Sequence, residues 1–426
     1  MKHKYFVIAS IFLMLPAFLL WGKEGGVTDE AQVLYEKHKE SVRQIRVINL
    51  ATGKKSAIGS GFQFSAQGHI ATNYHVISDY ISRPDQFRVE QIRHDDSSGT
   101  LEILDFDVIH DLAIVRDPTQ HDSFVELGNS NISKGARIYS MGNPYDLGMT
   151  IVEGTFNGFM EKSLYEKILF SGSLNSGMSG GPALNRDGEV LGINVSTMGN
   201  QVSFLVPVEY LETLYERVLK NGSRPVKDWD KYIEDQLVDN QKYYINELLS
   251  SKWESRPLGD AYIPGEISKA VKCWGGSKDD GDEMYNSDYV NCFNEDSIYI
   301  TSSHSTGSME YKYNWITSDK LNPFRFYNLY ESYFSFAHRY GNADEKDAEK
   351  FICNTDFVLV DGVDSKMVLC ARNYKKYPKL FDVNLSIASV EWNDKGLLTE
   401  VAITGVTKDN AIDIVRRFIR EIKWKK

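Results

Sequence analysis

The sequence predicts a mainly β first half, followed by a helical connector and a separate mixed α+β C-terminal domain. From about residue 42 to residue 206, short apolar or alternating runs are separated by Gly, Asn and Asp, which is typical of a β-barrel or sandwich. From about residue 257 the chain becomes rich in Tyr and Phe with Gly-Asp turns. Its 426 residues allow two or three domains. We expect domains at 23–222 and 257–426, joined by a connector at 223–256.

The pattern of apolar residues predicts the individual elements. The strands expected in the first domain are Val42 to Ile48, Phe87 to Arg93, Leu101 to Ile109, Arg137 to Met141, Ile168 to Ser171, Val190 to Val195 and Val202 to Val206. A short polar helix is expected from Asp29 to Glu40. Pro207 opens a second helix, with an apolar stripe at Leu211, Leu214, Tyr215 and Val218. A third helix is expected from Lys227 to Ser250, and Thr407 is the expected N-cap of an amphipathic C-terminal helix.

Composition and charge exclude several classes of protein. With 42% hydrophobic, 12% aromatic and 25% charged residues, the chain is neither disordered nor collagen-like. The formal net charge is −11, and a nucleic-acid partner is disfavoured because neutralising phosphates requires a basic surface. None of the four cysteines forms a C-x-x-C pair of the kind that holds zinc or does thiol redox chemistry. We expect no metal ion and no organic cofactor.

The N-terminus has the order of an export signal. Lys2, His3 and Lys4 precede an apolar run from Tyr5 to Trp21, and polarity returns at Gly22. Both a cleaved signal peptide and an uncleaved single anchor agree with residues 1–22, so membrane contact is expected only through this segment. Everything after it is expected outside the cytoplasm, in a bacterial-type periplasm or cell envelope, where disulfides persist.

All four cysteines lie in the C-terminal half, at positions 273, 292, 353 and 370. Four cysteines allow three connectivities. The simplest pairs Cys273 with Cys292 and Cys353 with Cys370, because each pair then closes a hairpin-sized loop. The alternative is four unpaired buried thiols.

Three polar residues of the first domain have the chemistry of nucleophilic acyl transfer, which needs a nucleophile, a base and an acid that orients the base. Ser179 lies in a Gly-rich turn from Asn175 to Pro182, where the backbone turns tightly enough to aim two N–H groups at one point. His75 follows an apolar strand, in an expected polar turn at the rim of a barrel. Asp111 leads directly into a strand that would bury its carboxylate.

The order His75, Asp111, Ser179 is that of the chymotrypsin-type triad, and the surrounding segments resemble HtrA-type serine proteases. The matching segments, in family order, are Gly59-Ser60-Gly61-Phe62, Thr72-Asn73-Tyr74-His75-Val76, Asp111-Leu112-Ala113-Ile114, Gly177-Met178-Ser179-Gly180-Gly181-Pro182, Gly192-Ile193-Asn194 and Phe204-Leu205-Val206-Pro207. The resemblance covers about residues 30 to 220. It implies a chymotrypsin-like double β-barrel of two six-stranded antiparallel barrels, with the active site between them.

The resemblance also implies roles and partners. The backbone N–H groups of Gly177 and Ser179 would form the oxyanion hole, and the substrates would be proteins or peptides. Trimers are usual in the family, so a homo-oligomer is possible.

The substrate pocket is expected to be apolar. It would be lined by Ser173 and Leu174, which precede the nucleophile, and by Ile193, Asn194 and Val195 on the strand that follows it. Ser173 occupies the position that is acidic in trypsin-like members, so a preference for Lys or Arg is not supported.

The sequence departs from the family at two places. Met178 stands where digestive relatives carry the Asp that pairs with a newly cut N-terminus, so that activation route is not expected. The C-terminal half lacks the carboxylate-binding loop of a PDZ domain. The alternative to an active protease is therefore a catalytically silent scaffold, whose C-terminal domain binds a partner or senses stress.

Overall fold

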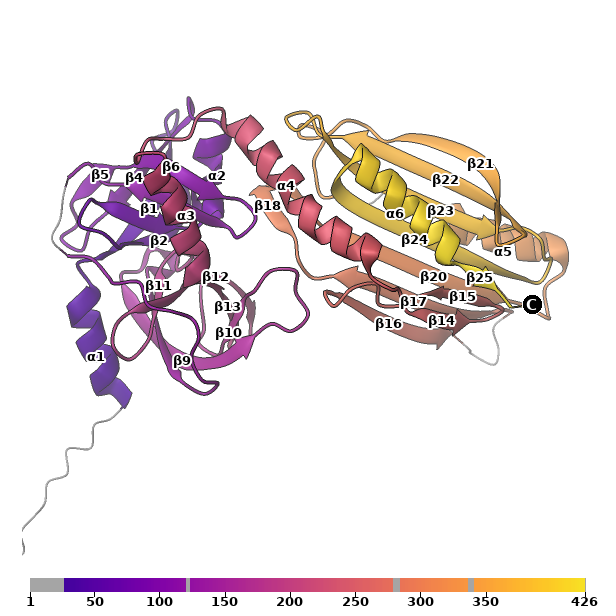
Figure 1. Ribbon diagram of the computed structural model, residues 1–426, viewed down its shortest axis with the longest axis horizontal. Coiled ribbons are helices and arrows are strands. Elements are labelled where there is room, and N and C mark those ends of the chain that lie inside the picture. Colours follow the sequence, from indigo (N-terminus) through magenta and orange to yellow (C-terminus); the bar gives the residue numbers. More distant parts are fainter. Residues whose placement is uncertain (1–26, 120–122, 279–283, 336–340, 426) are drawn as a thin grey trace, which may run out of the picture.

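The computed structural model describes residues 27–119, 123–278, 284–335 and 341–425 (Figure 1). The expected export segment, residues 1–22, lies outside the described residues. Strands make up 44% of the structure and helices 22%, which confirms the mainly β class. The molecule has two lobes side by side, and helix α4 (Trp229–Ser250) crosses from one to the other. In the part of the chain that the structure describes, no helix is long and apolar enough to cross a bilayer.

The first sheet of the N-terminal lobe is antiparallel and has seven strands, in the order β5-β4-β1-β2-β3-β7-β6. Its strands are β1 (Val42–Asn49), β2 (Lys55–Gln63), β3 (His69–Thr72), β4 (Phe87–Ile92), β5 (Ser98–Thr100), β6 (Glu102–Asp107) and β7 (Leu112–Arg116). A closed six-stranded barrel was expected here. The two ends of this order, β5 and β6, are separated in the chain by Leu101 alone, whose N–H donates to the Val89 carbonyl of β4. Because β5 pairs with β4 and β6 pairs with β7, this single run connects the two ends of the sheet, in agreement with the expected barrel.

The second sheet is a closed six-stranded barrel, as expected, in the order β10-β13-β12-β11-β8-β9. Its strands are β8 (Arg137–Gly142), β9 (Thr150–Phe159), β10 (Ile168–Phe170), β11 (Pro182–Leu184), β12 (Val190–Gly199) and β13 (Val202–Pro207). Helix α1 (Val27–His38) contacts β8 and β9, and helix α3 (Val208–Lys220) contacts β6 and β7 of the first sheet. The predicted stripe of α3 lies on its buried side, with Leu211, Leu214 and Val218 inside the core.

The C-terminal lobe is a seven-stranded antiparallel sheet with helices packed on it, in agreement with the predicted α+β class. Its order is β16-β17-β20-β24-β23-β22-β21. The strands are β16 (Val271–Lys278), β17 (Asn286–Asn294), β20 (Met309–Thr317), β21 (Ile352–Val360), β22 (Val363–Asn373), β23 (Leu380–Ser389) and β24 (Lys395–Thr407). Helices α4 and α6 (Lys408–Glu421) cover one face, and α5 (Pro323–Ser335) lies at one end of the sheet (Figure 1). The Thr407 hydroxyl accepts a hydrogen bond from the Asn410 N–H, which confirms it as the N-cap of α6.

Two small sheets complete this lobe. One consists of β14 (Ser255–Leu258), β15 (Ala261–Pro264) and β25 (Lys423–Trp424), and the other is the hairpin of β18 (Ile298–Thr301) and β19 (His304–Thr306). The hairpin contacts helix α2 (Tyr74–Ser82) of the N-terminal lobe. One hydrophobic core therefore includes Ile77 and Ile81 of α2 together with Ile298 and Ile300 of β18.

Helix α4, expected as a connector, makes specific contacts with both lobes. The Gln236 side chain accepts a hydrogen bond from Val108 N–H at 3.0 Å and donates one to the Phe106 carbonyl at 3.0 Å. One and a half turns later, Gln241 donates to the Gly405 carbonyl at 2.8 Å and accepts from Thr407 N–H at 2.9 Å. The helix thus bonds to the backbone of the N-terminal lobe through one glutamine and to the C-terminal sheet through the other.

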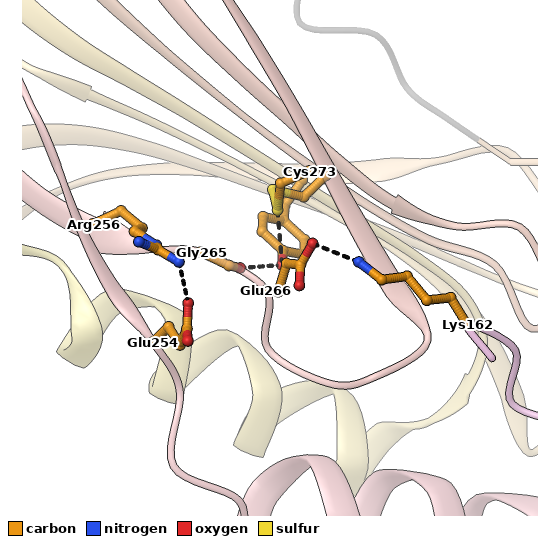
Figure 2. The surroundings of a disulfide bond; sticks show 8 residues. Lys162, Glu254, Arg256, Gly265, Glu266 and Cys273 are labelled. Carbon is orange, nitrogen blue, oxygen red and sulfur yellow. Dashed lines mark hydrogen bonds and ion pairs between the residues drawn. A yellow bond between two sulfur atoms is a disulfide. The ribbon is translucent and has the colours of Figure 1, made fainter.

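The structure contains disulfides Cys273–Cys292 and Cys353–Cys370, the local pairing that the sequence favours. Figure 2 shows the first of them, beside a segment that reaches the N-terminal lobe. In that segment the Gly265 carbonyl accepts a hydrogen bond from Tyr311, and Glu266 forms an ion pair with Lys162 at 3.0 Å.

Candidate active site

His75 lies in the first turn of α2, and not in the polar turn that the sequence predicts. The helix begins at Tyr74 with Asn73 as its N-cap residue. The backbone N–H of His75 donates to one Asp111 carboxylate oxygen at 2.8 Å, and its ring Nδ1 lies 2.6 Å from the other oxygen. This bidentate contact fixes both the start of the helix and the orientation of the imidazole.

Asp111 lies in the tight turn between β6 and β7, with a left-handed φ of 56° that Asp tolerates better than most residues. Its carbonyl accepts hydrogen bonds from Asn73 Nδ2 at 2.7 Å and from Tyr74 N–H at 3.3 Å. Backbone and carboxylate of Asp111 therefore both bind the N-terminus of α2. Local strain in the turn is offset by these contacts, which place the carboxylate beneath the imidazole.

The electrostatics of the pair favour the imidazolium form. Burial alone would lower the pKa of His75, but the negative charge of Asp111 and the hydrogen bond to it act in the opposite direction. Their combined effect is larger, so the pKa of His75 is raised above its ordinary value of 6.5. The side chains stay partly accessible, at 29% for His75 and 19% for Asp111, so the ring can meet a reactant.

Ser179 lies between β10 and β11, in a turn closed by a hydrogen bond from Met178 N–H to the Asn175 carbonyl at 3.0 Å. Gly177 has φ 98° in this turn, and a Cβ there would meet the Asn143 carbonyl oxygen at 2.4 Å, which explains why a glycine is needed. The residue at this position is therefore set by the backbone, whatever chemistry the turn performs.

The Ser179 turn of the second barrel is bound to the first sheet. Ser60 on β2 donates its N–H to the Ser179 carbonyl and its hydroxyl to the Gly177 carbonyl, both at 2.7 Å. A Cβ at Gly180 would meet Asn73 N at 2.9 Å, so the turn is in close contact with the segment just before His75. These contacts bring Ser179 to the end of β3 and the start of β7, where His75 and Asp111 lie.

The Ser179 hydroxyl bonds to a backbone carbonyl and not to the imidazole in this structure. It donates to the Val195 carbonyl at 3.3 Å, and no hydrogen bond between the two described residues Ser179 and His75 is present. Likewise, no described residue accepts a hydrogen bond from the backbone N–H of Gly177 or of Ser179. Two unbonded N–H groups beside the hydroxyl are what an oxyanion requires.

The other candidate acids and bases near the site have different partners. Asp105 is buried and ion-paired with Arg217 at 3.1 Å. Asp107 bonds to His110 Nδ1 at 2.8 Å. Neither carboxylate orients His75, so Asp111 is the carboxylate that contacts this ring. Among the described residues, no group of three His, Cys, Asp or Glu side chains is placed to bind a metal ion.

The five residues expected to line a substrate pocket do not share one surface. Ser173 is exposed, whereas Leu174 and Ile193 are buried in the hydrophobic cores of the N-terminal lobe. Asn194 is fully buried, donating to the carbonyls of Met141 and Met178 and accepting from Ser140. Val195 alone of the five borders a cavity that also touches His75.

This cavity has a volume of about 620 Å³ and a mostly apolar wall. The N-terminal lobe contributes His75, Asp111, Val195, Met160, Tyr165 and Phe204. Ile298 and Tyr299 of the β18–β19 hairpin form the opposite wall. Sequence reasoning missed Tyr299, because a single aromatic residue in a short alternating run gives no signal of where it will lie.

Comparison with known proteins identifies the N-terminal lobe. Residues 59–193 match the family described as trypsin-like peptidase domain. They form a trypsin-like peptidase domain. Protease Do-like 5, a chloroplastic protein of Arabidopsis thaliana, is 32% identical over 212 residues, which cover 41% of this chain and 65% of that protein. A probable periplasmic serine endoprotease, DegP-like, of Chlamydia pneumoniae is 27% identical over 180 residues, which cover 40% of this chain and 36% of that protein.

A solved serine endoprotease from Yersinia pestis is also similar, with 23% identity and a TM-score of 0.39 over 45% of this chain and 67% of that one. The resemblance of the sequence motifs to HtrA-type proteases is confirmed for the peptidase domain. The chain spans less than two thirds of the length of the two relatives above, and both matches leave more than half of this chain uncovered.

Proposed function

We propose that this protein is an exported serine endopeptidase that hydrolyses proteins of the cell envelope through an acyl-enzyme, with a role in protein quality control. Ser179 is the nucleophile, His75 the general base and acid, and Asp111 the group that orients His75. The observation that carries the proposal is the His75–Asp111 pair, with the Ser179 turn bound beside it. Sequence similarity to the trypsin-like peptidase domain family and to the periplasmic DegP-like relative also supports the proposal.

The reaction begins when the Ser179 hydroxyl leaves the Val195 carbonyl by rotation about its Cα–Cβ bond and donates to His75. His75 takes the proton as the serine oxygen attacks the scissile carbonyl, and Asp111 stabilises the imidazolium that forms. The N–H groups of Gly177 and Ser179 bind the oxyanion. His75 then protonates the leaving amine, and a water molecule hydrolyses the acyl-enzyme by the same steps in reverse.

The resting position of the Ser179 hydroxyl favours a second candidate, the catalytically silent scaffold. A serine that stays bonded to Val195 performs no chemistry, and the C-terminal lobe would then carry the function.

Homo-oligomers are expected for an active enzyme of this kind.

Labelling by a fluorophosphonate probe distinguishes the two candidates. The folded chain should take up the probe and digest unfolded casein, and both activities should disappear in Ser179→Ala and His75→Ala. Ser176→Ala is the matched control, because this exposed serine lies in the same turn and should label normally. A folded wild-type chain that takes up no probe would instead support the scaffold.

The pH dependence of cleavage provides a further check. Only neutral His75 accepts the serine proton, so kcat/KM should rise with pH as His75 loses its proton. Because the pKa of His75 is raised, the midpoint of this rise should lie above pH 6.5. A midpoint below that value would contradict the role of Asp111.

A further inference from the structure

Strand β12 has a free edge next to Ser179. It pairs with β11 only at Val190–Ile193, whereas its pairing with β13 continues to Gly199. From Val195 to Gly199, no described strand occupies the other edge. The Ser179 hydroxyl bonds to the Val195 carbonyl, so the free edge begins at the nucleophile.

If an extended peptide pairs with this edge, the strand geometry determines on which side each of its side chains lies. In an antiparallel arrangement the peptide runs from the Gly199 end toward Ser179, so that the residues preceding the scissile bond lie along β12. Side chains of an extended peptide alternate between two sides. The second residue before the scissile bond then faces opposite to the first, on the side of the cavity that contains His75 and Tyr299.

The C-terminal lobe holds one wall of this cavity in a fixed position. The Tyr299 ring meets the His75 ring edge to face, with centroids 6.0 Å apart and an interplanar angle of 73°. Ser78 donates a hydrogen bond to the Tyr299 hydroxyl at 3.4 Å. The Tyr74 hydroxyl donates to the Ile300 carbonyl at 3.1 Å. Strand β18 is therefore bonded to the same helix that carries His75.

The same segment of the C-terminal lobe also fixes the opposite wall. Asp296, with a side chain 3% exposed, accepts hydrogen bonds from Ser163 Oγ at 2.8 Å, Leu164 N–H at 2.6 Å and Lys167 Nζ at 2.9 Å. These three residues lie between β9 and β10, in the loop that also places Met160 and Tyr165 at the cavity. A buried carboxylate with three donors holds its loop far more firmly than an exposed ion pair.

We propose that the C-terminal lobe completes the substrate cleft, and that Tyr299 selects the second residue before the scissile bond. The subsite accepts a medium or large apolar side chain between Tyr299, His75 and Val195. This inference rests on the proposed endopeptidase activity. It assigns the C-terminal lobe a direct part in substrate choice, because its aromatic ring forms the subsite.

The test uses the full chain and a synthetic peptide library in which the second position before the scissile bond is Ala, Leu or Phe, with products read by mass spectrometry. The variants are Tyr299→Ala, Tyr299→Phe and the control Tyr289→Ala, which removes an exposed tyrosine of β17 away from the cavity. Fluorophosphonate labelling is measured on every sample, since it reports the nucleophile without needing a residue in the subsite.

The wild type should prefer Leu and Phe over Ala by roughly tenfold or more in kcat/KM, as is typical of an apolar pocket. Tyr299→Ala should remove most of that preference while still labelling with the probe. Tyr299→Phe should keep the preference, since it retains the ring, and Tyr289→Ala should match the wild type. An unchanged preference in a Tyr299→Ala enzyme that labels and cleaves would overturn this inference alone. Absence of both labelling and cleavage in the wild type would overturn the proposed function, and the subsite with it.

Discussion

The second barrel of the peptidase domain and the C-terminal sheet deal with strand edges in different ways. The barrel closes on itself through β9 and β10, so that none of its strands forms a full-length edge. The C-terminal sheet is open, and β16 and β21 are its edges. Cys273–Cys292 links β16 to β17, and Cys353–Cys370 links β21 to β22. An unprotected edge strand frays or pairs with other chains, so each edge of the open sheet is cross-linked where the barrel relies on closure.

The two regions also differ in the part that we propose for them in the reaction. The proposed catalytic groups lie in the peptidase domain and are oriented by contacts inside it, whereas the cleft wall at Tyr299 comes from the cross-linked sheet. Changes in one lobe should therefore affect catalysis and changes in the other should affect stability and selectivity.

The largest effect is expected from Asp111→Asn, which keeps the shape of the side chain but removes the charge that orients His75. We expect kcat to fall by about 10⁴-fold, with an unchanged melting temperature for the C-terminal lobe. Steady-state kinetics on casein peptides and calorimetry measure the two quantities. Asp107→Asn is the matched control, because Asp107 contacts His110 and not His75. An equal loss in both variants would contradict the assignment.

A smaller effect, on stability, is expected from Ile300→Ala. Ile300 is 1% exposed and belongs to the core that β18 shares with α2. Truncation of a buried Ile costs about 2–5 kcal/mol, and the loss should appear in the unfolding of the peptidase domain although the substitution lies in the other lobe. Denaturant unfolding followed by hydrogen exchange of peptides from the peptidase domain measures it, because residues 23–222 contain no Trp. Ile352→Ala, at a side chain 76% exposed, should change stability by less than about 0.5 kcal/mol. If the peptidase domain unfolds at the same denaturant concentration in both variants, the lobes do not share a core.

The smallest effect on the active site is expected on removing one edge cross-link, by Cys353→Ala together with Cys370→Ala. A sequence separation of 17 residues corresponds to about 3 kcal/mol of lost stability in the chain-entropy treatment. Removal of Cys273–Cys292, with a separation of 19, should cost a similar amount. Probe labelling of Ser179 should be unchanged under native conditions. Loss of labelling in either double variant would show that the peptidase domain depends on the edges of the open sheet.

Much of the site was predictable because its chemistry depends on short local patterns. Gly177 is required by its positive φ, and Asp111 leads directly into the buried strand β7, so both carry their signals in sequence. Helix α2 was not predicted, since Val76, Ile77 and Ile81 give its nine residues the composition of a strand. Its apolar face is buried against β1 and β18, which are distant in sequence, so packing overrides local preference.

The remaining misses have the same origin. Ile193 and Asn194 were expected in a pocket, but Ile193 is buried in the core shared with the first sheet and α3, and the Asn194 side chain bonds to three buried polar groups. Tyr299 gave no pattern to interpret, since its role depends on a contact with a helix more than two hundred residues earlier.

Helix α4 has a consequence for how the molecule moves in solution. Gln236 bonds it to the turn after β6, and Gln241 bonds it to the end of β24, only five residues further along the same rigid helix. Free rotation of one lobe against the other would break at least one of these two sets of bonds. The two lobes should therefore share a single rotational correlation time, with amide relaxation rates that follow the anisotropic tumbling of one elongated body.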